Sequence, residues 1–409
     1  MQVNFKAIGA TLLISGTMLG AGMLALPLVS AGMGFGYACL TLFLIWMLMT
    51  YTGLMLLEVC LSFPEGYGFD AIAKALFDTK GSYLINASLL LLLYALSSAY
   101  ISGGGSTYKS NLHQYLGLSL SPALVSLAFT LLIGGIVFVS TNAVDKVNRL
   151  LFSLNVLIFL ALSTVIQPYV DTGNLSESSD SAKYMLAAIP MFLTAFGFHG
   201  SVPSMVKYLG RDQPRTLRNV FVAGSLIPMG IYLLWVFNTL GALPRYGSHS
   251  FQAISSHNGS VGMFLDEFHA LVPTPQVPSL LSAFSSIALF TSYLCVSLGL
   301  FDAMASTLKR SDDTRQRLQT ALITYLPPLG FALFFPSGFV AALGAAAIFL
   351  VILAILFPAL ALIKLRRQED YQPSYQVSGG GTLHWAIGGA GIAIILFQLL
   401  VMQGLLPVF

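Results

Sequence analysis

The sequence predicts an all-α protein that crosses a membrane many times. Of its 409 residues, 56% are apolar and only 9% are charged, whereas about 25% of the residues in an ordinary soluble protein carry a charge. The mean hydropathy of +0.80 indicates the same class. Two of the long apolar runs are interrupted by glycines and small polar residues before a proline. The predicted fold must therefore contain two broken helices.

Eleven segments of the chain are apolar over the roughly 20 residues that one membrane span needs. The expected transmembrane helices are 7–31, 36–60, 82–105, 122–142, 148–168, 184–206, 219–243, 279–304, 318–335, 339–363 and 383–406. The ninth segment is short and contains Pro327 and Pro328, so we expect it to be kinked. Residues 1–409 are thereby predicted to form one membrane domain.

Lysine and arginine set the expected orientation in the membrane. If the N-terminus is cytoplasmic, the segments on that side carry 16 of these residues and the outer segments carry 3. Such an excess of positive charge marks the cytoplasmic side. The pattern predicts a cytoplasmic N-terminus and, after eleven spans, a C-terminus on the opposite side. The net charge of +3 is small and scattered, so no nucleic-acid partner is expected.

Two connections have features of their own. Residues 70–77 suggest a short surface helix, and residues 244–278 form the longest outer loop, which we expect to cover the outer mouth of the protein. The three cysteines, Cys39, Cys60 and Cys295, all lie in apolar runs. They are expected to be small core residues rather than a disulfide framework, and we expect neither a metal site nor a cofactor.

The first interrupted segment contains Gly16, Gly20 and Gly22 within seven residues and is followed by Pro27. Each glycine costs a helix about 1 kcal/mol relative to alanine. In lipid, every backbone group that leaves the helix needs another partner, so irregular backbone survives there only where it lines a cavity or is buried in protein. The pattern predicts a broken helix that binds a ligand. The alternative is a continuous helix whose glycines allow close packing.

The second interrupted segment, residues 192–203 in the sixth span, also combines glycines, small polar residues and a following proline. Five spans separate the starts of the two interrupted segments, so the second unit begins on the opposite membrane face. The expected units are a first five-span repeat at 1–170, an inverted second repeat at 183–365, and an extra span at 383–406. Inverted repeats that each begin with a broken helix are typical of secondary transporters, and the two breaks should lie beside each other.

Several segments resemble those of bacterial aromatic amino acid permeases. They are Gly20-Ala21-Gly22-Met23 with Pro27, Tyr100-Ile101-Ser102-Gly103, Phe196 to Ser204, Leu298 to Asp302, Leu326-Pro327-Pro328 and Pro336 to Phe339. Within this family the chain is more similar to the tyrosine-specific permeases than to the tryptophan permeases. The resemblance implies eleven spans, a LeuT-type inverted-repeat fold, a periplasmic C-terminus, and proton symport of an aromatic amino acid, L-tyrosine foremost, through the inner membrane.

An amino acid substrate would be held mainly by the backbone of the two breaks. The half-helix that begins at Gly22 has free N–H groups and the positive end of the helix dipole, which suit a carboxylate. The half-helix that ends near Thr17 leaves carbonyl groups for the ammonium, as does the sixth span near Ala195. The backbone candidates are Gly16, Thr17, Met18, Gly20, Ala21, Gly22, Thr194 and Ala195.

The aromatic ring of the substrate needs an apolar slot. Phe198, beside the second break, is the first candidate for contact with the ring and Phe196 is the second; packing against lipid or core is the alternative. In the third span, Tyr94, Ser97 and Ser98 share one helical face. We include Tyr94 and Ser98 among the candidate site residues, although helix packing explains such hydroxyl groups equally well.

Three residues in the spans near the breaks are candidates for coupling transport to an ion. His199 lies well inside the sixth span, where an ionisable group usually has a task. It could donate to a substrate phenol or take part in proton movement; the alternative is a neutral ring bonded to a neighbour. Thr291 and Ser292 lie where related folds place a sodium-ligand pair, so sodium coupling stays open.

Two acidic residues lie at the ends of spans, and both are further coupling candidates. Glu58 and Asp302 fall near the cytoplasmic ends of the second and eighth spans. We favour pairing with basic residues at the interface, such as Lys309 or Arg310, over a proton relay or inner gate.

Other classes of function have less support in the sequence. A channel would need a charged ring or a repeated filter segment, and an enzyme would need a nucleophile with its base or a metal cluster; neither G-x-S-x-G nor H-E-x-x-H occurs. No catalytic residue is therefore expected. A permease for tryptophan, phenylalanine or a broader substrate range stays open, as does an amino acid sensor built on a transporter fold.

Overall fold

The computed structural model describes residues 5–20, 22–139, 141–177, 182–256, 259–272, 274, 276–310 and 313–409. The regular elements in these residues are helices, and none of them is a strand. The longer helices are α1 (Phe5–Met18), α2 (Gly22–Ser30), α3 (Phe35–Leu61), α4 (Phe69–Leu116), α5 (Pro122–Val139), α6 (Thr141–Ile166), α8 (Ala182–Ala195), α9 (Val202–Leu209), α10 (Pro214–Ala242), α13 (Gln276–Thr307), α14 (Thr314–Phe334), α15 (Phe339–Val351), α16 (Phe357–Leu365) and α17 (Gly381–Met402).

Each of the eleven predicted spans falls on one or more of these helices. In the described part of the chain, nine helices are long and apolar enough to cross a membrane, and the bent pair α1 and α2 would make ten. The segment predicted as the ninth span is helical as α14, with both prolines inside it, but it is not among these nine. The membrane class and the all-α fold are thus confirmed, while the count of eleven and the LeuT-type repeat stay predictions.

Shorter helices occupy the connections. The first turns of α4 form the predicted surface helix, which ends in a kink where Phe77 and Asp78 leave helical geometry. The long loop before α13 contains α11 (Phe251–Ser256) and α12 (Val261–Leu271), and Leu265 and Phe268 of α12 are buried. Between α6 and α8 the chain forms η1 (Gln167–Tyr169) and α7 (Thr172–Ser176).

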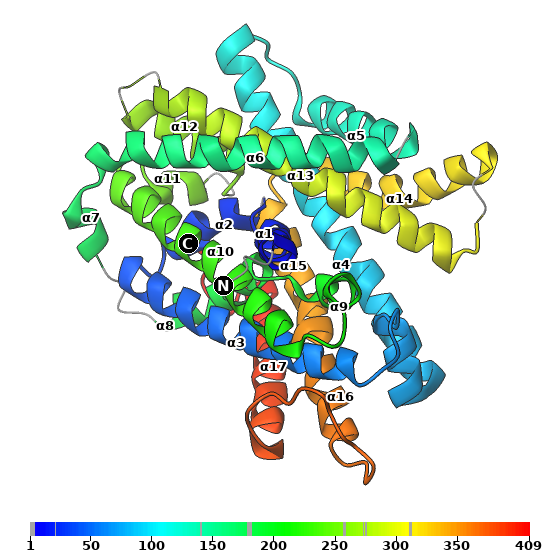
Figure 1. The fold of residues 1–409 in the computed structure, drawn as a ribbon. Coiled ribbons are helices and arrows are strands. Elements are labelled where there is room, and N and C mark those ends of the chain that lie inside the picture. The colour runs from blue at the N-terminus through cyan, green and yellow to red at the C-terminus, as the bar shows by residue number, and fades with distance from the viewer. Residues whose placement is uncertain are drawn as a thin grey trace.

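Helix α4 runs obliquely from the lower right to the top of the view in Figure 1 and packs against α13 and α15. Both α1 and α3 pack on α10, and α13 packs on α6. At the lower edge of the view in Figure 1, α16 lies beside α17. Helices α1 and α2, which carry the first interrupted segment, both pack on α10, and α2 also packs on α8.

A proline inside a helix frees a backbone carbonyl group, because proline has no N–H for the carbonyl four residues earlier. Pro27, Pro228 and Pro327 are three of the prolines in such positions. In each case a side chain of another helix donates to the freed oxygen: Trp235 to Met23 at 3.0 Å, Ser15 to Gly224 at 2.9 Å, and Tyr94 to Ile323 at 2.8 Å. Neighbouring side chains thus replace the missing helical bonds, as a lipid environment requires.

One irregularity was not expected from the sequence. Between α15 and α16 the chain forms a π-helical turn, η3 (Ile352–Leu356). Pro358 follows within one turn. Since this proline cannot donate to the carbonyl of Ala354, we attribute the wider turn to the missing bond.

Candidate functional site

The first interrupted segment is a true break between two helices. Helix α1 ends at Met18, α2 begins at Gly22, and their axes differ by 54°. A Cβ placed on Gly22 would lie 3.9 Å from Cα of Ala195 at the end of α8, and one placed on Gly20 would lie 2.6 Å from Oγ of Ser292. The break is therefore wedged between α8 and α13, and the N-terminus of α2 faces the second interrupted segment.

The second interrupted segment is also broken. Helix α8 ends at Ala195, and a short turn and η2 (His199–Ser201) precede α9. Both breaks converge on Tyr232 of α10, whose side chain is fully buried. Its hydroxyl lies 2.6 Å from the carbonyl oxygen of Met18 and 2.9 Å from that of Ala195. The last carbonyl groups of α1 and α8 thus lie next to the same hydroxyl group.

The remaining backbone candidates lie close to these ends. Gly16 faces the ring of Phe152 on α6, which a Cβ placed on this glycine would approach to 3.5 Å. The hydroxyl of Thr17 donates to the carbonyl of Ile14 at 2.7 Å, and that of Thr194 donates to the carbonyl of Met191 at 2.7 Å. Ala21 lies outside the described residues.

The two candidate phenylalanines point to different neighbours. Phe196 is buried and its ring meets the edge of the Tyr232 ring at 5.3 Å, beside the point where the breaks converge. Phe198 is buried against α3, where its ring fills the space that a side chain on Gly53 would need, and it stacks on Phe221 at 5.9 Å. Phe196 is thus nearer to Tyr232, whereas Phe198 occupies a packed position; contact with a substrate stays a prediction for both.

His199 is buried and lies between the second break and α3. Its Nε2 is 2.9 Å from the hydroxyl of Thr52, and either atom can donate, depending on the tautomer of the ring. Its Nδ1 has no hydrogen-bond partner in the described part of the chain. The ring therefore has one satisfied and one available nitrogen.

The candidates on α4 both donate to backbone carbonyl groups, and contact with a substrate stays a prediction for them. Tyr94 donates to the carbonyl of Ile323 on α14, and Ser98 donates to the carbonyl of Tyr94 at 2.9 Å. Sequence reasoning missed Tyr100, a buried residue of the same helix whose phenol lies within electrostatic reach of Tyr232 and Cys295. The segment beginning at Tyr100 was already part of the resemblance to the permeases, and that was the available signal.

An open face of α13 leads to the first break. Ser292, Cys295 and Gly299 follow one another at helical spacing, and the first is partly exposed while the other two are exposed. Because α13 packs between α4 and α6, this exposure lies on an interior helix. Thr291 is buried, and its hydroxyl donates to the carbonyl of Ile287 at 2.8 Å.

Glu58 lies far along α3 and is fully buried. Arg366 binds its carboxylate in a bidentate manner, with Nε 2.8 Å from Oε1 and Nη2 2.7 Å from Oε2. The hydroxyl of Tyr371 donates to Oε1 at 2.9 Å and the N–H of Val377 to Oε2 at 2.6 Å. The expected pairing with a basic residue is confirmed, but the partner is Arg366 rather than Lys309 or Arg310.

Outside the spans, the network raises the pKa values of two of its members. The hydrogen bond from Arg366 to Glu58 raises the pKa of the guanidinium, and burial raises the pKa of Tyr371 to about 12. The shifts favour the protonated forms, in which both groups donate to Glu58. Asp302, the other acidic candidate, is exposed and lies within electrostatic reach of Tyr325 on α14.

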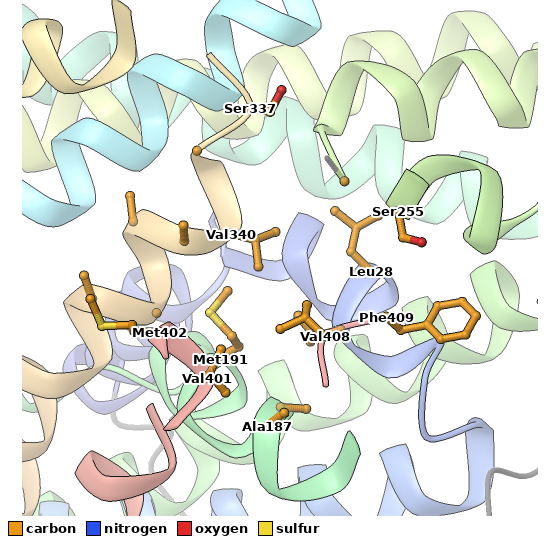
Figure 2. Close-up of a pocket in the computed structure, with 18 of the residues that line it drawn as sticks. Leu28, Ala187, Met191, Ser255, Ser337, Val340, Val401, Met402, Val408 and Phe409 are labelled. Atoms are coloured by element: carbon orange, nitrogen blue, oxygen red, sulfur yellow. The ribbon is translucent and has the colours of Figure 1, made fainter. Parts of the chain in front are cut away.

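A cavity of about 820 Å³ lies beyond the breaks, on the side toward which α2 ends and α8 begins. Figure 2 shows Leu28 of α2, Met191 of α8 and Val340 of α15 around it, with Phe409 near its edge. Most of its lining is apolar, and Ser255 and Ser337 contribute polar atoms. Because Met191 is one turn before the end of α8, this cavity approaches the second break.

Comparison with known proteins identifies relatives over nearly the full chain. Residues 4–398 match the model of the tryptophan/tyrosine permease family. The tyrosine-specific transport system 1 of Haemophilus influenzae is 36% identical over 98% of both chains. The tryptophan-specific transport protein of Pseudomonas aeruginosa is 36% identical over 91% of this chain and 89% of its own. The low affinity tryptophan permease of Escherichia coli is 31% identical over 97% and 95%.

These relatives are transport proteins, not enzymes. Together with the apolar helices of the fold, they make this a multi-pass membrane protein. The matched residues include both breaks and all of the helices around them. The chain belongs to the tryptophan/tyrosine permease family.

Proposed function

We propose that the protein is a secondary active transporter that imports an aromatic amino acid, L-tyrosine, by proton symport across the bacterial inner membrane. Its N-terminus would be cytoplasmic and its C-terminus periplasmic. Relatives named for tyrosine and for tryptophan transport support an aromatic substrate. Because the chain is 36% identical to a relative of each kind, the uptake experiment below includes tryptophan as well. A single chain with inverted five-span repeats would carry the alternating motion.

The convergence of the two breaks is the observation that carries this proposal. An amino acid has a carboxylate at one end of its backbone and an ammonium at the other. The N-terminus of α2 offers N–H groups and a positive dipole end, and the last carbonyls of α1 and α8 meet at Tyr232. The two poles of the substrate would lie against these two sets of backbone groups.

The ring of the substrate would then extend toward the aromatic side chains around the breaks. Phe196 lies against Tyr232, and Tyr100 approaches the same residue from α4. The cavity on the other side of the breaks is large enough for an aromatic amino acid to approach from the outer face.

For the coupling ion we propose a proton, on the strength of the resemblance to the permeases. His199, Glu58 and Asp302 are the candidate carriers. The hydrogen bond to Thr52 favours a packing role for His199, and the bond to Arg366 makes Glu58 part of a fixed network. Thr291 and Ser292 are the residues that would serve sodium instead.

Uptake by the purified protein in proteoliposomes tests this proposal. Labelled tyrosine, tryptophan and phenylalanine are supplied in turn, under an imposed proton gradient, an imposed sodium gradient or neither. We expect a proton gradient alone to drive accumulation of tyrosine. Accumulation driven only by a sodium gradient would identify sodium, not the proton, as the coupling ion. Preferential accumulation of tryptophan would identify tryptophan, not tyrosine, as the substrate. Equilibration without accumulation of any of the three would overturn the assignment as a symporter.

A further inference from the structure

The hydroxyl of Tyr232 contacts two carbonyl groups with a single proton. The oxygens of Met18 and Ala195 lie 2.6 Å and 2.9 Å from it. A phenol can donate to one of them at a time. At any moment one carbonyl at this buried point therefore lacks a full hydrogen bond, and the phenol oxygen itself still has lone pairs to offer.

The same point is favourable for a positive charge. Met18 ends α1 and Ala195 ends α8, so the negative ends of two helix dipoles meet there. In the described part of the chain, none of the three oxygens is hydrogen-bonded to a carboxylate. A cation at this point would be stabilised by neutral dipoles alone, which suits a charge that arrives and leaves with a substrate.

We propose that Tyr232 is a specificity-determining residue that selects substrates with a protonated α-amino group. This inference rests on the proposed function. In the empty site the phenol holds the two carbonyls around one point. A substrate ammonium brings three N–H donors: it binds one carbonyl and the phenol oxygen, while the phenol donates to the other carbonyl. The unsatisfied acceptor is then satisfied without any ionised side chain.

The position of Tyr232 is fixed independently of any ligand. Its ring packs edge-on against Phe196 at 5.3 Å. One turn further along α10, Trp235 donates to Met23 of α2. Helix α10 thus holds both halves of the first break, and the phenol oxygen stays in place when its hydrogen-bond partners change.

Substitution Tyr232→Phe removes one oxygen and keeps the ring. The experiment measures how well unlabelled tyrosine and 3-(4-hydroxyphenyl)propionate, which lacks the amino group, compete with labelled tyrosine for the purified protein. We expect the variant to bind tyrosine about tenfold more weakly, the size of a lost hydrogen bond to a charged group. The affinity for the analogue without an amino group should not change, so the ratio of the two affinities falls.

Tyr108→Phe is the matched control, because the hydroxyl of Tyr108 also donates to a carbonyl of another helix, that of Ser286 at 2.9 Å, away from the breaks. It should leave both affinities as they are. If Tyr232→Phe does not fold, 3-fluorotyrosine at position 232 nearly keeps the shape and, measured at a pH at which the phenol is neutral, weakens its oxygen as an acceptor, so it should lower the same ratio.

If Tyr232→Phe lowers the affinities for tyrosine and for the analogue equally, Tyr232 is a structural residue and the inference is overturned. An unchanged affinity for tyrosine would overturn it as well. These outcomes are distinct from failure of the proposed function, in which the wild-type protein itself would bind no aromatic amino acid.

Discussion

Breaking the buried pair of Glu58 and Arg366 should strongly destabilise the protein. The side chain of Glu58 is 0% exposed and that of Arg366 is 15% exposed. Removing one member of such a pair leaves an uncompensated charge and typically costs about 3–5 kcal/mol. Beyond the pair, Arg366 also donates to the carbonyls of Val377 at 2.8 Å and Gly379 at 2.7 Å, so the connection before α17 should loosen with it.

The two single substitutions should differ in size. Glu58→Gln leaves Arg366 with its bonds to the connection and some access to water, and we expect a loss of about 3 kcal/mol. Arg366→Gln leaves a fully buried carboxylate with only the donors from Tyr371 and Val377, and we expect a loss of about 5 kcal/mol. The double substitution removes both charges, and its loss should be smaller than the sum by about 2 kcal/mol.

Reversible unfolding in a lipid environment, followed for the wild type, both single variants and the double variant, measures these losses. His249 and Glu267 form a matched control, since the pair is at a similar distance but its His249 side chain is 50% exposed; Glu267→Gln should cost less than about 1 kcal/mol. Losses at Glu58 and Arg366 that are as small as this control, or that simply add, would mean that the two side chains are not coupled as a buried ion pair.

Three further predictions concern the interior of the protein. Cys295 should react with a small maleimide and be protected by bound tyrosine, whereas Cys60 should not react, because only the former thiol is exposed; mass spectrometry of the labelled protein shows which thiol reacted. Gly53→Ala should lower the unfolding free energy by about 1–3 kcal/mol, since its Cβ would lie 2.4 Å from the buried ring of Phe198; a neutral result would mean that the ring can move. His199→Gln should leave the dependence of uptake on external pH parallel to that of the wild type, because the side chain can still bond to α3; a flattened profile would assign the histidine to proton coupling.

The breaks could be predicted from sequence because they are local features. Glycines at 16, 20 and 22 and the small residues around 194–201 disfavour a helix wherever they stand in an apolar run. The eleven apolar segments are equally local, and each is helical in the structure. The short apolar segment and the two prolines of α14 are local features too. For this reason the sequence already marked the ninth expected span as short and kinked.

The partners of the breaks could not be predicted in the same way. Tyr232 is 214 residues from Met18, and Arg366 is 308 residues from Glu58. Nothing in the periodicity of α10 distinguishes Tyr232 from other tyrosines in apolar runs. The directions in which the side chains of Phe198 and His199 point could not be predicted from the sequence either, because an unwound segment has no helical period from which a face can be derived.

Proline positions offered a signal that was not used. A proline inside a span releases the carbonyl four residues earlier, and a donor from another helix is one way to satisfy it. Applied to Pro327, this rule requires a donor at Ile323, and Tyr94 provides it. The rule identifies the carbonyl of Ile323 as a group that needs a donor, but it could not have named Tyr94 as that donor.

Binding of labelled tyrosine to Gly22 variants is the most direct test of the claim that the substrate lies against the N-terminus of α2. An alanine at this position fits, since its Cβ would be 3.9 Å from Cα of Ala195, whereas a leucine would extend into the place proposed for the carboxylate. Gly9→Leu is the control on the same span, because no atom lies within 4 Å of its Cβ position. We expect Gly22→Leu to remain folded but to bind no tyrosine, and Gly9→Leu to bind it as the wild type does. Normal binding by Gly22→Leu would contradict the proposed site.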